Sequence, residues 1–410
     1  MTRFRAVVLA ACMLTASDGL AQPLSGRGFV DVSGALFPQD ASNDPTNAVV
    51  DFRTRGELFW QPAAWLQLAG GVDVRANTHD QVSSSWVPDL SDRGVLRPAL
   101  SVRRLSATVN RDGLTVDLGR QFVRWGKADI VTPTDRFAPR DYLNVIDAEV
   151  LPVVGVRVTY QRGSEAFEAA WVPVFTPSRL PLLDQRWTVT ARPDIPLAYA
   201  ADQRLPTQDQ FGVRWSHTGS GYEYAAMFFD GLNHLPNIEA RVVAQPLEVE
   251  IVRHFPAIRT YGGDAAVSTR WFTLKSEAAY FDAVSAINDE YVLYVIQVER
   301  QTGEWLFTAG YAGEIVTFDG PDESFAPDRG TARSIVGRGS YNLDANQSLA
   351  FESAIKQTGD GVYVKGEYSM TTGQHWRTTV AGTLIAGSGD DFIGQYQRND
   401  NITVNLRYSF

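Results

Sequence analysis

The chain has 410 residues, a formal net charge of −10 and a hydrophobic content of 44%. The acidic balance argues against nucleic acid as a partner, because binding to nucleic acid depends on cationic side chains. After the first 21 residues no apolar run approaches the roughly 18 residues of a membrane helix, so the chain could cross a membrane only as a closed β-barrel. A soluble all-β protein is the alternative that composition leaves open.

The first 21 residues have the features of a secretory signal peptide. Arg3 and Arg5 precede an apolar stretch over residues 6–14, and small residues follow at the spacing that a signal peptidase requires. We therefore expect cleavage after Ala21.

A lipoprotein signal is the competing interpretation of this segment. Residues 9–12, Leu-Ala-Ala-Cys, fit a lipobox, but the apolar core before Cys12 is short and apolar sequence continues past it. Cys12 is also the only cysteine, so the processed chain would fold without disulfides. We expect residues 22–410 to form a single domain.

Short and long connections alternate along the rest of the chain. The short ones are rich in Gly, Asn and Asp, as in β-hairpin turns. They lie at residues 61–63, 111–113, 163–164, 218–221, 270–271, 302–303, 344–346 and 372–373. The long ones are polar and cover residues 38–47, 78–95, 124–149, 175–207, 231–255, 284–290, 318–331, 358–360 and 387–399. Eight turns between nine loops predict an all-β, up-and-down antiparallel transmembrane barrel of about 18 strands, with 16 as the second choice.

Apolar and charged positions alternate within the predicted strands. Over residues 50–60 and 362–370, the charged side chains fall on one face and the apolar side chains on the other. On a face turned to lipid, a charge at mid-bilayer would cost about 2–4 kcal/mol, so the charged face is expected to line the interior. The adjacent pair Arg103-Arg104 breaks the alternation and predicts a bulge or a position at the membrane edge.

Tryptophans gather near the short turns, where an aromatic belt at the edge of the hydrocarbon would lie. A soluble sandwich gives no reason for this placement; ordinary core tryptophans are the alternative interpretation. The six are Trp60, Trp65, Trp215, Trp271, Trp305 and Trp376.

The last ten residues alternate without exception and end on an aromatic residue. One face would carry Ile402, Val404, Leu406, Tyr408 and Phe410. A chain with a secretory signal and this final strand resembles the bacterial outer-membrane β-barrels. That resemblance implies a bacterial outer-membrane location, contact with outer-membrane lipid and lipopolysaccharide, and the barrel assembly machinery as a partner.

A barrel of 18 strands has a backbone radius of roughly 18 Å, which side chains alone cannot fill. A long loop folded inward would narrow it, and residues 119–142 are the best candidate. Here Gly119-Arg120-Gln121 runs into Trp125-Gly126-Lys127, and the segment resembles poorly characterised bacterial porin-like barrels. The resemblance implies a channel or an export barrel.

Charged side chains of both signs are concentrated in this loop. A transverse field across a water-filled opening would select solutes by charge, whereas the same ion pairs could simply fasten the loop to the wall. The constriction candidates are Arg124, Lys127, Asp129, Asp135, Arg136, Arg140 and Asp141.

The face expected to line the interior is mildly basic, while acidic residues concentrate in the long loops. This pattern favours small anionic or carboxylate solutes, unless the interior charges only pair with one another and hydrate. The lumen-facing candidates are Arg53, Arg55, Arg75, Arg157, Lys275, Lys365 and Arg407.

We therefore expect a porin-like channel, monomeric or homotrimeric, through which small polar solutes diffuse. An export or lipid-trafficking barrel that works with periplasmic partners is the alternative. A hydrolase inside the barrel has the least support, because Ser216 and His217 face opposite walls and no fixed partners are evident for His234 and His254. We expect no enzyme activity, cofactor or metal; the acidic loop at 319–328 lacks the ligand order of a calcium loop.

Overall fold

The computed structural model describes residues 24–189, 195–201, 203–244, 247–285, 288–320 and 325–410. The predicted signal peptide and the lipobox lie outside these residues.

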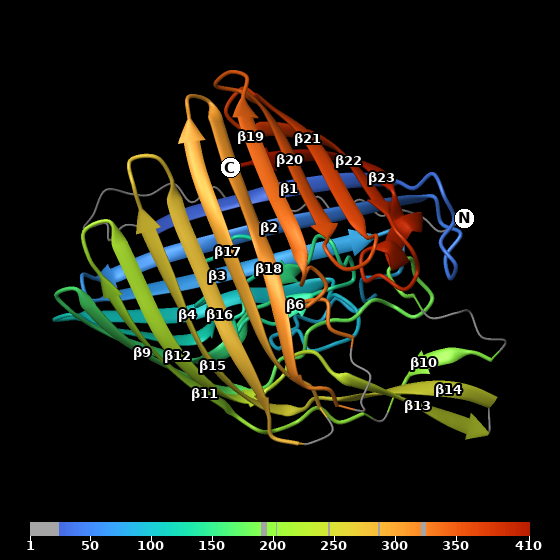
Figure 1. Ribbon diagram of the computed structural model, residues 1–410, viewed down its shortest axis with the longest axis horizontal. Coiled ribbons are helices and arrows are strands. Elements are labelled where there is room, and N and C mark those ends of the chain that lie inside the picture. The colour runs from blue at the N-terminus through green and yellow to red at the C-terminus, as the bar shows by residue number, and fades with distance from the viewer. Residues whose placement is uncertain (1–23, 190–194, 202, 245–246, 286–287, 321–324) are drawn as a thin grey trace.

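Eighteen strands of the described residues form one antiparallel sheet that closes on itself, because β1 pairs with both β2 and β23 (Figure 1). The first nine are β1 (Leu24–Leu36), β2 (Ala48–Ala63), β3 (Leu66–Asn77), β4 (Leu100–Arg111), β5 (Leu114–Gln121), β8 (Val153–Arg162), β9 (Glu165–Val174), β11 (Gln210–Thr218) and β12 (Tyr222–Leu232). The others are β15 (Ala257–Ser268), β16 (Thr273–Ala283), β17 (Glu290–Thr302), β18 (Trp305–Phe318), β19 (Ser334–Asn342), β20 (Gln347–Lys356), β21 (Val362–Thr372), β22 (Trp376–Ala386) and β23 (Asn401–Ser409). The predicted fold class and strand number are confirmed.

Each predicted long loop joins two barrel strands at one end of the barrel, and the short turns join them at the other. One turn lies slightly later than predicted. β2 continues through Pro62 to Ala63, and the pairing with β3 shifts register between Trp60 and Ala63. Proline cannot donate to a strand ladder, so an irregular position of this kind accommodates it.

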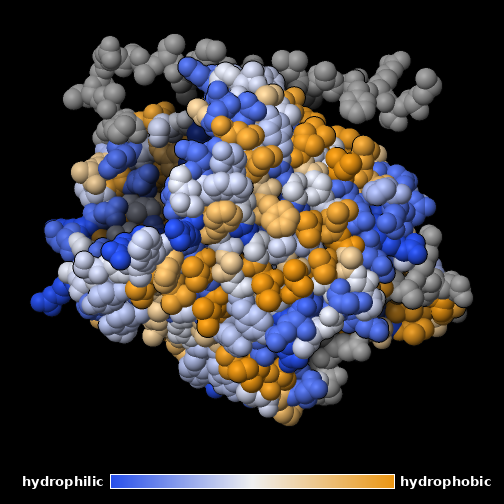
Figure 2. Space-filling view, turned by 45° about the horizontal axis from the view of Figure 1, so that its top comes forward, coloured by the Kyte–Doolittle hydropathy of each residue, from blue (hydrophilic) through white to orange (hydrophobic). Residues whose placement is uncertain are grey.

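Alternating side chains give the wall two different faces. Ile402, Val404 and Leu406 of β23 are exposed on the outside, whereas Arg407 of the same strand contacts Asp31. Figure 2 shows hydrophobic residues in groups across the face that it presents, with hydrophilic residues between them and along the edges of the view. The exterior therefore suits hydrocarbon and the interior suits water.

The predicted bulge is present at the arginine pair. Gly71 of β3 lies opposite Arg104, and Val72 lies opposite Val102, so Arg103 is the additional residue of β4. A bulge shifts the following side chains by one position. As a result both adjacent arginines reach carboxylates inside the barrel.

The remaining elements lie in the long loops. They are β6 (Arg140–Asp141) paired with β7 (Glu149–Val150), the sheet of β10 (Leu197–Tyr199), β13 (Asn237–Ala244) and β14 (Leu247–His254), and the 3₁₀-helix η1 (Gly394–Asn399). The sheet of β10, β13 and β14 lies beside the barrel at the end with the long loops (Figure 1). None of the helical structure in the described residues is long and apolar enough to span a bilayer.

The seam between the first and last strands closes at the terminal aromatic residue. The N–H of Gly28 donates to the carbonyl of Phe410 at 2.9 Å, and the N–H of Phe410 donates to the carbonyl of Gly28 at 3.0 Å. A Cβ atom at Gly28 would lie 2.6 Å from the carbonyl oxygen of Arg55 and 2.6 Å from the Phe410 ring. Only glycine fits at this close approach.

We predict that Gly28→Ala weakens the seam. The added methyl group meets backbone as well as the ring, so the strands must separate or shift, and overpacking of this kind typically costs about 1–3 kcal/mol. The measurement is the temperature at which the folded band of the protein converts to the unfolded band on electrophoresis in detergent. Gly34→Ala is the matched control on the same strand, because a Cβ there meets nothing within 4 Å. Equal conversion temperatures for the two variants would contradict the prediction.

Candidate functional site

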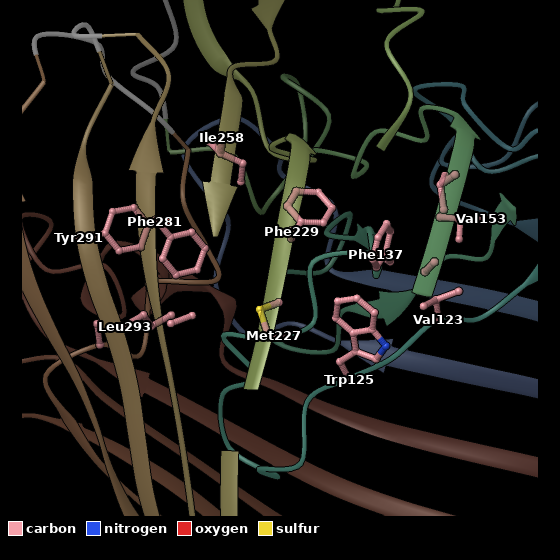
Figure 3. Packing of buried hydrophobic residues seen from close by; sticks show 14 residues of the cluster. Val123, Trp125, Phe137, Val153, Met227, Phe229, Ile258, Phe281, Tyr291 and Leu293 are labelled. Atoms are coloured by element: carbon pink, nitrogen blue, oxygen red, sulfur yellow. The ribbon is translucent and has the colours of Figure 1, made fainter. Parts of the chain in front are cut away.

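The loop between β5 and β8 enters the barrel and packs on the inner wall. Trp125 and Phe137 of the loop are buried, and their rings contact each other edge to face at 5.1 Å between centroids. Phe137 makes a second edge contact, at 5.0 Å, with Phe229 of β12 (Figure 3). Met227 and Phe281 of the wall belong to the same cluster. An apolar core thus lies inside the barrel, where it binds the loop.

Polar side chains of β16 and β17 hold the backbone of the same loop. The carboxylate of Glu277 accepts hydrogen bonds from the N–H groups of Lys127 and Thr134, both at 2.8 Å, and of Ala128 at 3.0 Å. Gln297 accepts from the N–H of Asp129 at 2.9 Å. Glu277 and Gln297 are almost fully buried, so these bonds fix the loop against the wall.

The end of the loop reaches the opposite wall. Glu149 lies among Arg53, Arg55, Arg75 and Arg103 of β2, β3 and β4, at 3.2, 3.1, 2.7 and 3.0 Å respectively. Burial opposes ionisation of this carboxyl, but the charges of the arginines outweigh it and hold the pKa of Glu149 well below its ordinary value. Because β16 and β2 lie on facing sides of the closed sheet, the loop crosses the lumen.

A buried ion cluster joins this loop to its neighbours. Asp141 accepts from Arg97 at 2.8 Å and from Arg179 at 2.6 Å, and Arg179 also contacts Asp92. Burial favours the neutral carboxyl, but Arg97 and Arg179 hold the pKa of Asp141 well below its ordinary value. The loops after β3, β5 and β9 are therefore fastened at one point.

The predicted constriction residues all lie in the loop that crosses the lumen, but they have different surroundings. Arg124 pairs with Asp135 at 3.0 Å, and Lys127 contacts Glu223. Asp129 pairs with Lys275 at 2.8 Å. The guanidinium of Arg136 lies over the ring of Phe281, Arg140 donates to the hydroxyl of Thr132 at 3.3 Å, and Asp141 forms the ion cluster described above.

The lumen-facing candidates of the wall are paired with carboxylates inside the barrel. Arg53, Arg55 and Arg75 surround Glu149. The other four pair with partners on the wall or the loop: Arg157 with Asp117, Lys275 with Asp129, Lys365 with Asp147, and Arg407 with Asp31.

The sequence patterns did not single out the partners of these residues. Glu277 and Gln297 face inward in the strand pattern, yet nothing in the pattern joins them to the loop. The loop after β9 also folds inward: Arg186 donates to the carbonyls of Gln39 and Thr46, and Trp187 packs against Tyr396. In the sequence, the inward fold of the loop after β9 is indicated by the adjacent charged and aromatic residues Arg186 and Trp187.

A cavity of about 680 Å³ remains between the loops and the wall formed by β1, β2, β3, β19, β20, β21 and β23. Its cationic side chains are Arg53, Arg75, Arg97, Arg186, Arg338, Lys365 and Arg407. Its anionic side chains are Asp31, Asp51, Asp147, Glu149 and Glu352. Cations therefore outnumber carboxylates around this opening.

The histidines of the described residues contact carboxylates or backbone carbonyls. His217 contacts Glu165, and His254 contacts Glu239 at 2.8 Å. The ring nitrogens of His234 lie 2.7 Å from the carbonyl oxygen of Thr176 and 2.9 Å from that of Arg136. Burial lowers the pKa of His234 to about 4. Within the described ranges, no group of three or more His, Cys, Asp or Glu side chains is placed to hold a metal ion.

Comparison with solved structures identifies the architecture. A BenF-like porin from Pseudomonas fluorescens Pf-5 superposes with a TM-score of 0.56 at 9% identity, covering 96% of this chain and 99% of that one. OccAB4 of Acinetobacter baumannii superposes with a TM-score of 0.53 at 10% identity, covering 94% and 98%. The chain has the fold of bacterial outer-membrane porins. No protein-family model matches it, and no curated protein does.

We predict that Glu277→Ala releases the loop of this porin-fold barrel. Three loop N–H groups lose their acceptor, and a buried donor without a partner costs about 1–3 kcal/mol. The backbone of the freed loop becomes accessible to a protease at Arg124, Lys127 and Arg140, so trypsin should cut within residues 124–140 of the variant but not of the wild type.

The matched control for loop release is Glu299→Ala. It removes one carboxylate from the adjacent strand, where Glu299 pairs with Lys275 at 3.2 Å, but it leaves the loop backbone bonded. Cleavage of both variants at the same rate would show that loss of charge, and not loss of the loop acceptor, is responsible.

We predict that the Asp141 cluster confers stability that is lost in acid. Because the pKa of Asp141 is lowered on folding, its contribution is fully present above the ordinary carboxyl pKa of about 4 and is lost as the pH falls further. Asp141→Asn should cost about 3–5 kcal/mol at neutral pH, because it removes the carboxylate partner of Arg97 and leaves the buried Arg179 with Asp92 alone.

Hydrogen exchange in residues 90–97 and 176–182 measures this effect. Exchange should be faster in Asp141→Asn at pH 7, and the difference from wild type should shrink below pH 4. Asp112→Asn is the control, because its pair with Arg111 is exposed on a turn and contributes little. Unchanged protection in Asp141→Asn would refute the prediction.

Proposed function

We propose that this protein is a porin-like channel of the bacterial outer membrane through which small polar solutes diffuse, with a preference for anions. The apolar exterior and charged interior of the barrel support passage of polar solutes across lipid. The porin fold supports the same function.

The arrangement of arginines around the 680 Å³ cavity is the observation that carries the anion preference. Two of the lining arginines, Arg53 and Arg75, belong to a cluster with Arg55 and Arg103, and the carboxylates that pair with this cluster among the described residues are those of Asp73 and Glu149. Excess positive charge along a water-filled passage raises the local concentration of anions, as rings of basic side chains do in anion pores.

The loop between β5 and β8 gives the channel its narrow part in this proposal. Its contacts on facing walls serve as a latch, and its charged side chains bound the remaining opening. The same loop therefore acts as latch and constriction, because the ion pairs that hold it against the wall also place charged side chains where solutes pass.

The test is the reversal potential in a planar bilayer with a gradient of KCl. We expect chloride to permeate more readily than potassium through the wild type. Glu149→Gln should raise the chloride-to-potassium ratio about sevenfold, because a unit charge about 7 Å away in water contributes roughly 0.6 kcal/mol, close to RT, to the energy of each ion, with opposite signs for chloride and potassium. The glutamine amide keeps an oxygen that accepts from the arginines, so the variant changes the charge more than the contacts.

Glu304→Gln is the control for this measurement, since Glu304 is exposed on the turn between β17 and β18. It should leave the ratio unchanged. Strong cation selectivity of the wild type would overturn the anion preference, and the absence of any channel activity would overturn the proposed function itself.

A further inference from the structure

A second cavity, of about 210 Å³, lies among four of the long loops. Its lining includes Arg136 and Arg140 from the loop after β5, His234 from the loop after β12, and Asp328 from the loop after β18. At about 30 Å³ per water molecule, the cavity has room for roughly seven waters or for one small organic molecule.

The charged side chains of this cavity are not paired with one another. Arg136 is buried, its guanidinium lies 4.8 Å from the centre of the Phe281 ring, and its Nε has no hydrogen-bond partner. Arg140 donates to the hydroxyl of Thr132 at 3.3 Å. Among the described residues, Asp328 has no ion pair or hydrogen bond from its side chain.

This lack of pairing contrasts with the rest of the interior. Asp129 and Glu149, on the same loop, each contact a lysine or an arginine. The one other carboxylate in the lining of the cavity, among the described residues, is Asp135, which pairs with Arg124. A buried charge without a partner is costly, so the buried guanidinium of Arg136, with the half-buried Arg140 and Asp328 around the same cavity, favours an occupant that pairs with these groups.

Tyr142 lines the same cavity as the three charged side chains Arg136, Arg140 and Asp328. Burial raises the pKa of Tyr142 above its ordinary value; the charge of Asp328 adds to this, whereas Arg140 and Arg136 oppose it.

Apolar residues form another part of the wall. They are Ile130, Val145, Ile146, Leu235 and Leu293. A complementary molecule would carry a carboxylate for the guanidinium groups, an ammonium for Asp328 and a small aliphatic group for this surface.

We propose that the cavity binds a small zwitterion of the α-amino-acid class, with its carboxylate on Arg136 and Arg140 and its ammonium on Asp328. The inference rests on the proposed channel function and names a class of solute that the loops would hold. His234 acts as a positioning residue, because one ring nitrogen faces the backbone carbonyl of Arg136 and the imidazole stacks on Phe175.

Calorimetry with three matched probes tests the proposal on the purified full-length barrel in detergent. L-valine carries both charges, isovalerate lacks the ammonium and isobutylamine lacks the carboxylate. We expect L-valine to bind at least tenfold more tightly than either of the others, since each lost charge-assisted bond contributes about one factor of ten or more.

Two variants test which side chain binds the carboxylate of the ligand and which binds its ammonium group. Asp328→Asn should weaken L-valine about tenfold and leave isovalerate unchanged, whereas Arg140→Gln should weaken L-valine and isovalerate alike. Arg338→Gln is the control, because Arg338 lines the larger cavity and is not part of the lining of the smaller one. It should leave the affinity for L-valine unchanged, and the electrophoretic shift on heating checks that each variant is folded.

Equal affinities of the wild type for L-valine and isovalerate would overturn the proposal, as would an unchanged preference in Asp328→Asn. Conductance of the same preparation separates this inference from the proposed function. Channels without L-valine binding would refute the amino-acid site alone, whereas L-valine binding without channels would refute the channel and leave the site.

Discussion

Closure of the sheet is the constraint on which the rest of the structure depends. In hydrocarbon an unpaired backbone N–H or C=O is too costly, so the first and last strands must meet. They do so along β1 and β23, where Gly28 and Phe410 form the last pair of backbone hydrogen bonds. Closure around eighteen strands leaves an interior too wide for wall side chains to fill, and the long loops therefore fold into it.

The loop between β5 and β8 is held inside the barrel by two kinds of contact. The apolar cluster of Trp125, Phe137 and Phe229 resembles the core of a soluble domain, while the carboxylates of the loop bind arginines of the wall. The apolar contacts hold the loop against the wall, and they do not depend on the orientation of particular bonds. The ion pairs and the Glu277 hydrogen bonds fix the orientation of the loop backbone. The same ion pairs place charged side chains around the remaining opening.

Most of the fold could be predicted from the sequence, but much of the interior could not. Alternation and turn residues are local signals, so the strands, the loop ranges and the bulge at Arg103 followed from the order of residues. Pro62 misled the placement of one turn, because a proline within a strand is tolerated at a register shift. The contacts of Glu277 and Glu149 join distant residues, and an irregular loop has no period from which they could be inferred.

The contacts between loop and wall also set an order of assembly. The bond from the N–H of Asp129 to Gln297 spans 168 residues, and that from Lys365 to Asp147 spans 218. Such long-range contacts are the slowest to form, and they require that the later strands already be in place. We therefore expect the bore to be wider before the loop reaches these partners than in the finished barrel.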